Sequence, residues 1–313
     1  MSSNTLTKAA ADRLKNTAAI ASISVAVSLC LLKVFGALLT DSLAVLSSMI
    51  DSLSDIFGSL ITLIAIRYAA KPASCEHRYG YGKAEALSTL TQAAFIAGSG
   101  LFVMYDGFSR FITPRPVADT GLGLVVMIIS IIATLILISF QRYVAKKTNS
   151  QAILADSAHY VVDILTNGSI ILSLFVVRFF DFQWFDPLTA IFIALYLLYN
   201  AYLLARDAIA LLLDRELPDE IRCRVEKTVT ALPFVCGMHD LRTHDLGGAY
   251  MFEFHLELDG SLSLCQAHEY SDAVSAKLRK EFPDAQIIIH QDPSGIKEIR
   301  LDDKLVNNKR NKS

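Results

Sequence analysis

Charged side chains are scarce in this sequence. Asp, Glu, Lys and Arg make up only 19% of the 313 residues, 53% are hydrophobic, and the mean hydropathy is +0.41. Ordinary soluble domains carry about 25% charged residues, so the composition favours a membrane protein. The formal net charge is only −2. This balance excludes a strongly basic surface, and with it the binding of nucleic acid through such a surface.

Two familiar motifs are also missing. The five cysteines are odd in number, widely separated and never spaced as C-x-x-C: Cys30, Cys75, Cys223, Cys236 and Cys265. Their pattern excludes a disulfide framework and a thiolate cluster, so we expect reduced thiols. Residues 1–16 lack the apolar core and cleavage site of a secretory signal. We therefore expect the first apolar segment to stay in the mature chain.

Long apolar segments dominate what is present. A membrane core about 30 Å thick needs about 20 helical residues, and six segments are long enough: 17–39, 42–68, 85–110, 121–144, 152–178 and 185–212. The sequence therefore predicts an α-helical membrane protein with six transmembrane helices. Lysine and arginine gather before the first segment, after the second and after the fourth. Those loops and both termini are expected to face the cytosol.

The chain changes character near residue 214. A helix start lies at 217–220, apolar and polar residues alternate over 252–258, a helical pattern covers 264–281, and a second strand is expected at 286–290. These elements predict a small soluble α+β domain. We expect four parts in all: a cytosolic segment 1–16, a transmembrane domain 17–213, a cytosolic metal-binding domain 214–295 and a disordered basic tail 296–313.

Ionisable side chains occur where the membrane interior is expected. Asp51 and Asp55 lie in the second apolar segment, and His159 and Asp163 lie in the fifth. Each pair is four residues apart, so its side chains share one helix face. Burying such groups costs at least about 2–3 kcal/mol each, which makes them functional candidates. Counting along antiparallel helices places both pairs roughly 14–20 Å below the outer surface, where they can meet.

A divalent cation would explain this convergence, because three carboxylates cannot all stay ionised side by side in a membrane. Four N/O ligands suit a tetrahedral site, and an imidazole favours zinc, iron or cobalt over magnesium and calcium. Interhelical hydrogen bonds or a proton relay are the alternatives for the same residues. Asp156, one turn nearer the cytosol, is expected either to line the access path or to be an ordinary solvated residue.

Several motifs occur in order along the chain: VLSSMIDSLSD at 45–55, GYGKAE at 80–85, ADSAH at 155–159 with Asp163, DR at 214–215 with LPDE at 217–220, and IHQDP at 289–293. With them the sequence resembles the cation diffusion facilitator family, in particular its bacterial ferrous-iron and zinc efflux pumps, over about residues 15–295. The resemblance implies a homodimer, a transport site at the four membrane residues, and a ferredoxin-like cytosolic domain that binds further metal.

The resemblance also implies residues outside the membrane. A cytosolic binuclear site would use His239, His255, His268, His290 and Asp292, and four of the chain's seven histidines are in this set. A charge interlock would use Lys83 and Asp214. Zinc is thus expected both as a transported and as a structural ion, with ferrous iron as a second transported ion.

The loop after residue 69 departs from the family pattern. Ser74, His77 and Tyr81 stand where the family has an aspartate and two histidines. Cys75, Glu76 and His77 form a replacement cluster that would suit zinc, and an ordinary solvated loop is the alternative.

The expected function is efflux of zinc or ferrous iron from the cytosol by proton antiport, with alternating access across a lipid bilayer. By resemblance this bilayer is a bacterial inner membrane. An intramembrane metalloenzyme is disfavoured because no H-E-x-x-H motif is present, so we expect no enzyme activity. A membrane-anchored cytosolic metal sensor without transport stays open, and the sequence does not separate zinc and iron from cadmium, cobalt or manganese.

Overall fold

A computed structural model divides the chain into two compact units, Met1–Ile209 and Ala210–Ser313. We call them the helical unit and the α/β unit. The structure describes residues 7–40, 43–112, 121–180, 184–296, 300–301 and 303–304. Most of the predicted tail, 296–313, therefore lies outside the described residues.

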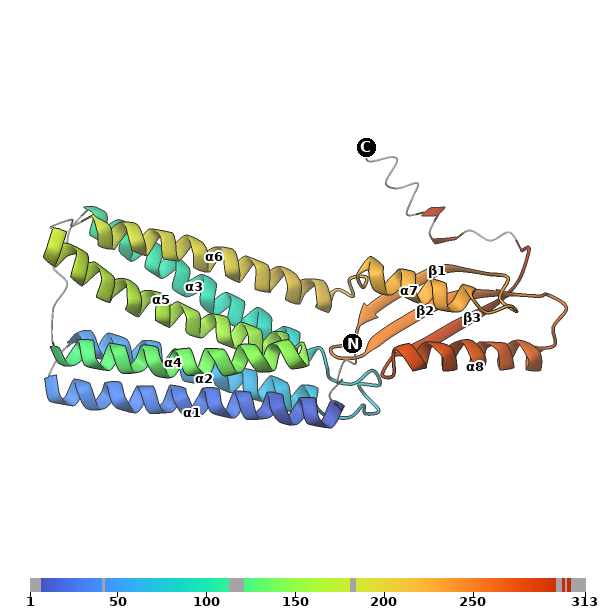
Figure 1. The fold of residues 1–313 in the computed structure, drawn as a ribbon, viewed down its shortest axis with the longest axis horizontal. Coiled ribbons are helices and arrows are strands. Elements are labelled where there is room, and N and C mark those ends of the chain that lie inside the picture. Colours follow the sequence, from blue (N-terminus) through green and yellow to red (C-terminus); the bar gives the residue numbers. More distant parts are fainter. Residues whose placement is uncertain are drawn as a thin grey trace. The chain divides into compact units, whose positions relative to one another are not determined.

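Long helices running side by side make up the helical unit (Figure 1): α1 (Lys8–Thr40), α2 (Leu43–Ala69), α3 (Ala84–Ile112), α4 (Gly121–Thr148), α5 (Gln151–Phe180) and α6 (Phe185–Leu212). Their bounds follow the six apolar segments, except that α1 begins earlier. Residues 8–16 continue as helix ahead of the first apolar segment.

Four of these helices are long and apolar enough within the described residues to cross a membrane: Lys8–Phe35, Ala84–Arg110, Met127–Thr148 and Pro187–Leu212. The remaining two are α2 and α5, which carry the ionisable residues. Asp156, His159 and Asp163 lower the hydropathy of α5, and the side chains of the first part of α2 lie outside the described residues. Spanning by α2 and α5 stays a prediction.

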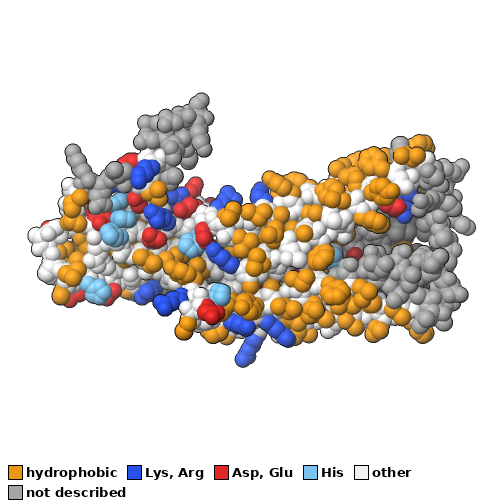
Figure 2. Space-filling view, turned by 180° about the vertical axis from the view of Figure 1, so that it is seen from behind, with side chains coloured by type: hydrophobic (Ala, Val, Ile, Leu, Met, Phe, Trp, Pro, Cys, Tyr) orange, Lys and Arg blue, Asp and Glu red, His pale blue; other side chains and the backbone are white. Residues whose placement is uncertain are grey.

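Small side chains let the helices approach one another. Ala18 and Ala19 of α1 and Ala152 of α5 belong to one buried cluster, while Ile96, Val162 and Leu197 join α3, α5 and α6 in another. Large apolar side chains cover much of the outer surface of this unit, as Figure 2 shows. Exposed apolar surface on this scale is unusual for a soluble monomer and fits contact with lipid.

A three-stranded sheet and two helices form the α/β unit, in the order α7 (Asp219–Thr230), β1 (Gly237–Asp245), β2 (Tyr250–Leu258), α8 (Leu264–Glu281) and β3 (Gln286–Pro293). The strand order is β1-β2-β3, with β1 antiparallel and β3 parallel to β2. Phe252, Phe254 and Leu256 on β2 point into the core shared with α7 and α8. The intervening residues of β2 face the other side.

A capping box begins helix α8, and an irregularity interrupts strand β1. Ser263 caps α8 through a capping box with Gln266. Strand β1 was not predicted from the sequence, because its residues are mostly polar and the pairing with β2 is shifted between His239 and Arg242. Asp240 at this irregularity has a φ of 53°, which interrupts the alternation that reveals a strand.

Candidate metal centres

A buried histidine and aspartate meet inside the helical unit. His159 Nε2 of α5 lies 2.9 Å from Asp55 Oδ1 of α2, and their side chains are only 7% and 11% exposed. The counting of helix depth predicts this meeting of α2 and α5. His159 Nδ1 is buried and has no hydrogen-bond partner among the described residues. This contact is also what an interhelical hydrogen bond would look like, so metal ligation by the pair stays a prediction.

The other two predicted membrane ligands are placed less fully. Asp163 lies one turn further along α5 than His159 and is partly buried. The backbone of Asp51 belongs to α2, one turn before Asp55, but its side chain lies outside the described residues. Roles for both as metal ligands stay predictions.

Asp156 lies in a buried polar network rather than in solvent. It is only 1% exposed. Its Oδ2 accepts hydrogen bonds from Gln141 Nε2 and Ser22 Oγ, both at 2.6 Å, and its Oδ1 accepts from Ser59 Oγ at 3.2 Å and Gln92 Nε2 at 3.3 Å. The expectation of a solvated interfacial aspartate is therefore wrong. Sequence reasoning missed the four neutral donors, because isolated serines and glutamines in helices carry no pattern.

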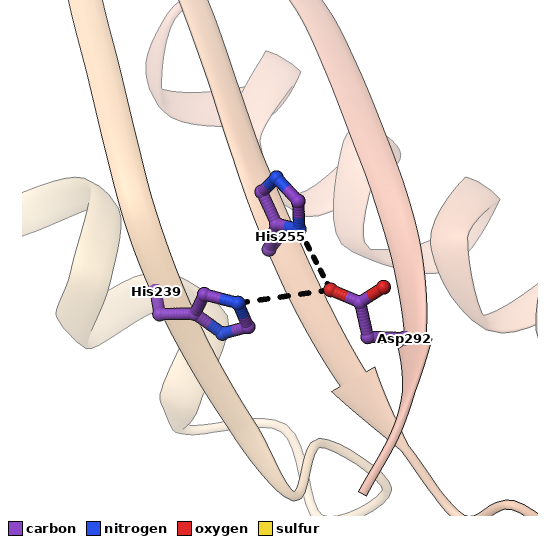
Figure 3. A group of neighbouring side chains, drawn as sticks. All are labelled: His239, His255 and Asp292. Atoms are coloured by element: carbon purple, nitrogen blue, oxygen red, sulfur yellow. Dashed lines mark hydrogen bonds and ion pairs between the residues drawn. The ribbon is translucent and has the colours of Figure 1, made fainter. Parts of the chain in front are cut away.

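Strand register assembles a second cluster in the α/β unit. His239 of β1 pairs with His255 of β2, which pairs with His290 of β3, so three imidazoles form one row across the sheet. Each of His239, His255 and Asp292 offers a ligand atom within 4.8 Å of the others. Asp292 Oδ2 lies 2.7 Å from His255 Nδ1 and 3.7 Å from His239 Nε2, and both rings point toward this carboxylate (Figure 3).

The donor set of this cluster fits a transition metal. Zinc sites use imidazole nitrogen and carboxylate oxygen at about 2.0–2.2 Å, so small movements of these side chains suffice to close around an ion. His290 lies at the exposed edge, with Nε2 3.3 Å from Asp292 Oδ1. The structure does not bring His268 into the group. His268 is exposed on α8, 3.6 Å from Asp272 Oδ2, and its ligand role stays a prediction.

Side-chain contacts connect residues of the loop between α2 and α3. Ser74 Oγ lies 2.9 Å from Tyr81 Oη, and the His77 ring lies against the Tyr81 ring with centroids 4.5 Å apart. Cys75 is an exposed free thiol. Among the described residues, this loop gathers no three candidate ligands within metal-binding reach. A metal site at Cys75 and His77 stays a prediction that the described geometry does not support.

The predicted interlock joins residues of different units, Lys83 and Asp214, and stays a prediction as well. Within the α/β unit, Asp214 Oδ1 lies 3.7 Å from His244 Nε2. All five cysteines are free thiols in the structure.

Family models match both parts of the chain. The family model described as "Cation efflux transmembrane domain" matches residues 19–213, and that described as "Cation efflux protein, cytoplasmic domain" matches residues 217–294. The chain belongs to the cation efflux family. This result confirms the resemblance inferred from the motifs at 45–55, 155–163 and 289–293.

Individual relatives agree with the family match. Cation-efflux pump FieF of Escherichia coli O139:H28 (strain E24377A / ETEC) and that of Escherichia coli (strain K12 / DH10B) are each 43% identical to this chain over 284 residues, which cover 91% of this chain and 94% of the relative. A solved structure of the transporter CzrB is 31% identical, covers 25% of this chain and 99% of its own, and has a TM-score of 0.25.

The two family models and the FieF relatives settle the class of protein. The chain is a membrane transporter for cation efflux, and its family is not an enzyme family.

Proposed function

We propose that the protein exports a divalent transition metal, zinc or ferrous iron, from the cytosol in exchange for protons. The transport site comprises Asp51, Asp55, His159 and Asp163. The observation that carries this proposal is the buried 2.9 Å contact between His159 of α5 and Asp55 of α2. It brings a carboxylate and an imidazole from two helices to one point of a unit that belongs to a cation-efflux family.

Ligand chemistry supports both halves of the exchange. An imidazole with carboxylates binds zinc, ferrous iron or cobalt in preference to magnesium or calcium. These ligands bind metal only when deprotonated, so protons and metal compete for the same atoms. In the proposed cycle the inward-open site captures the ion, the helices rock to open the site outward, and protons displace the metal there.

The proposal includes the arrangement of the whole chain. All six long helices span the membrane, residues 17–213 form the transmembrane domain, and residues 214–295 form a ferredoxin-like cytosolic domain. Segment 1–16 and tail 296–313 are cytosolic. The bilayer is a bacterial inner membrane, which the similarity to FieF of Escherichia coli supports.

A cytosolic metal site accompanies the transport site. His239, His255, His290 and Asp292, with His268, bind zinc there, and the compact arrangement of three of them supports this assignment. Two copies of the chain form a homodimer, and metal that binds only the assembled form adds its binding free energy to assembly.

The same compact cluster alone would also suit a membrane-anchored metal sensor that does not transport, but the match to a cation-efflux family argues against this rival. Metal binding by the α/β unit without metal flux would identify this rival. Flux measurements on membrane-site variants therefore separate the two functions.

The test uses proteoliposomes that contain a metal-sensing dye. Asp55→Ala and Asp163→Ala are each expected to abolish uptake of zinc driven by a pH gradient, because each removes a ligand and a proton acceptor. Asp207→Ala is the matched control, since Asp207 is 53% exposed and pairs with Arg206. Normal flux in both site variants would end the transport-site assignment. Repeating the assay with ferrous iron, cobalt, cadmium and manganese at two internal pH values identifies the substrate.

A further inference from the structure

A second carboxylate lies beside the histidine row of the α/β unit. Glu257 is two residues beyond His255 on the same face of β2, and it pairs in register with Gly237 of β1 and Asp292 of β3. Its side chain is only 18% exposed. Neither the sequence motifs nor the three-residue cluster includes it.

Glu257 faces the ring nitrogen of His239 that the cluster does not use. Glu257 Oε1 lies 3.1 Å from His239 Nδ1, while His239 Nε2 points toward Asp292 Oδ2 at 3.7 Å. The ring is 8% exposed, and Nδ1 is buried without a partner in hydrogen-bond geometry among the described residues. A slight rotation of the ring would let Nδ1–H donate to Glu257. The lone pair of Nε2 would then point toward His255 and Asp292.

The guanidinium of Arg300 contacts the same carboxylate of Glu257. Arg300 Nη2 donates to Glu257 Oε1, and Arg300 lines one cavity together with His239, Glu257 and Asp292. The next residue is anchored nearby, because the Leu301 N–H donates to Asp240 Oδ2 at 2.8 Å. A guanidinium thus lies where the electric field of the two carboxylates attracts a positive charge.

Gly237 makes room for this arrangement. A Cβ at this position would lie 2.8 Å from Glu257 Oε2 and 3.0 Å from its carboxyl carbon. Any larger residue would therefore push the Glu257 carboxylate away from His239.

We propose that Glu257 is a positioning residue that holds His239 for metal binding, and that Arg300 is an internal cation that competes with the metal. The proposal rests on the proposed function in one respect, namely that His239, His255 and Asp292 bind metal. A carboxylate on the outer nitrogen of a metal-binding histidine fixes the tautomer and the ring orientation, and strengthens the ligand. Arg300 opposes this in two ways. It withdraws negative charge from Glu257 and repels an incoming dication.

The experiment titrates zinc into the full chain in detergent and follows the heat of binding by calorimetry. Every variant carries Asp55→Ala and His159→Ala, so that the cytosolic sites dominate the signal. Glu257→Ala is expected to weaken zinc binding about 10- to 100-fold, the range found for lost outer partners of metal ligands. Gly237→Ala should shift the affinity in the same direction. Glu253→Ala is the matched control, because Glu253 lies on the same face of β2 and pairs with Arg242 instead.

Arg300→Gln is expected to tighten zinc binding about two- to fivefold at low salt, the size of effect a partly exposed ion pair gives. Raising the salt concentration should shrink this gain, because salt screens the charges. In the Glu257→Ala background, the gain from Arg300→Gln should be smaller, because the part that acts through Glu257 is lost and only the direct repulsion of the dication remains. Arg242→Gln is its control and should leave the affinity unchanged.

Three outcomes decide the matter. If Asp292→Ala in the same background leaves zinc binding unchanged, the cluster is not a metal site and the proposed function loses its cytosolic part. If Asp292→Ala weakens binding but Glu257→Ala matches the Glu253→Ala control, the positioning role of Glu257 is wrong. If Arg300→Gln weakens binding, or acts equally with and without Glu257, the competing role of Arg300 is wrong. Melting curves in chelator show whether each variant is folded.

Discussion

The Asp156→Asn variant tests whether the buried polar network holds the helical unit together. The carboxylate accepts four hydrogen bonds from Ser22, Ser59, Gln92 and Gln141, which lie on α1, α2, α3 and α4. The two 2.6 Å contacts to Oδ2 are as short as charge-assisted hydrogen bonds. All four partners are neutral donors, so an ionised carboxylate is fully hydrogen-bonded here without a cation.

Asparagine cannot reproduce this pattern in either orientation of its amide. Its NH₂ group would face Gln141 Nε2 on one side or Gln92 Nε2 on the other, and both are donors. The less costly orientation keeps the two 2.6 Å contacts and leaves Ser59 and Gln92 without this acceptor. Unsatisfied buried donors cost about 1–3 kcal/mol each, and the remaining bonds fall from charged to neutral strength. Ser59 and Gln92 retain contacts with Tyr160 and Thr62, and relief of carboxylate burial offsets part of the loss.

The net destabilisation is therefore about 2–4 kcal/mol. For a unit of this size, each kcal/mol lowers the melting temperature by about 2–4 °C, which gives a fall of roughly 4–16 °C. The assay is thermal unfolding of the full chain in detergent, followed by the helical circular dichroism signal. Asp207→Asn, at a half-exposed side chain, is the control. A double variant with Gln141→Leu should lose less stability than the sum of the single variants, because Asp156→Asn already weakens the contact that Gln141→Leu removes.

Two results would refute the claim that this carboxylate stabilises the packing of the helices. One is a melting temperature of Asp156→Asn equal to that of the parent. The other is a loss of stability in the double variant equal to the sum of the two single losses.

Three further predictions concern other contacts. Lys15→Met breaks the ion pair of Lys15 with Glu85, which is 2.7 Å long with both side chains 13% exposed. It is expected to cost about 1–3 kcal/mol, because it leaves the part-buried Glu85 carboxylate with one partner fewer. Thermal unfolding in detergent measures this loss, and equal stability of variant and parent would contradict it. Zinc at 100 times its dissociation constant should stabilise the folded α/β unit by about 2.7 kcal/mol. Asp292→Ala should abolish this gain, and chelator should reverse it. Ser263→Ala removes the α8 cap and should cost about 0.5–2 kcal/mol, whereas Ser261→Ala, outside the capping box, is its control in denaturant titrations.

The predictable parts of this protein are those with a repeating or costly signal. The apolar segments predicted the six long helices, and the alternation over 252–258 predicted the strand observed as β2. Ionisable residues stand out in an apolar segment, which singled out Asp55 and His159. The rise per residue of two antiparallel helices then placed the two side chains at the same depth.

Features that depend on contacts distant in sequence were not predictable. Strand β1 is polar and irregular, so neither hydropathy nor alternation shows it. Glu257 looks like any solvent-facing residue of β2 until β1 and β3 place His239 and Asp292 beside it. The role of Gln141 and Ser22 as hydrogen-bond donors to Asp156 becomes visible only when α4 and α1 pack against α5.

The parallel pairing of β2 with β3 has a consequence for the stage of folding at which the proposed cytosolic metal site can form. Parallel neighbours need a crossover, and here α8 supplies it between His255 and Asp292. A growing chain that has produced β1 and β2 holds two imidazoles but no shared carboxylate. Only when α8 docks and β3 enters the sheet do His239, His255 and Asp292 surround one point, so metal binding at the proposed cytosolic site would report completed folding of this unit.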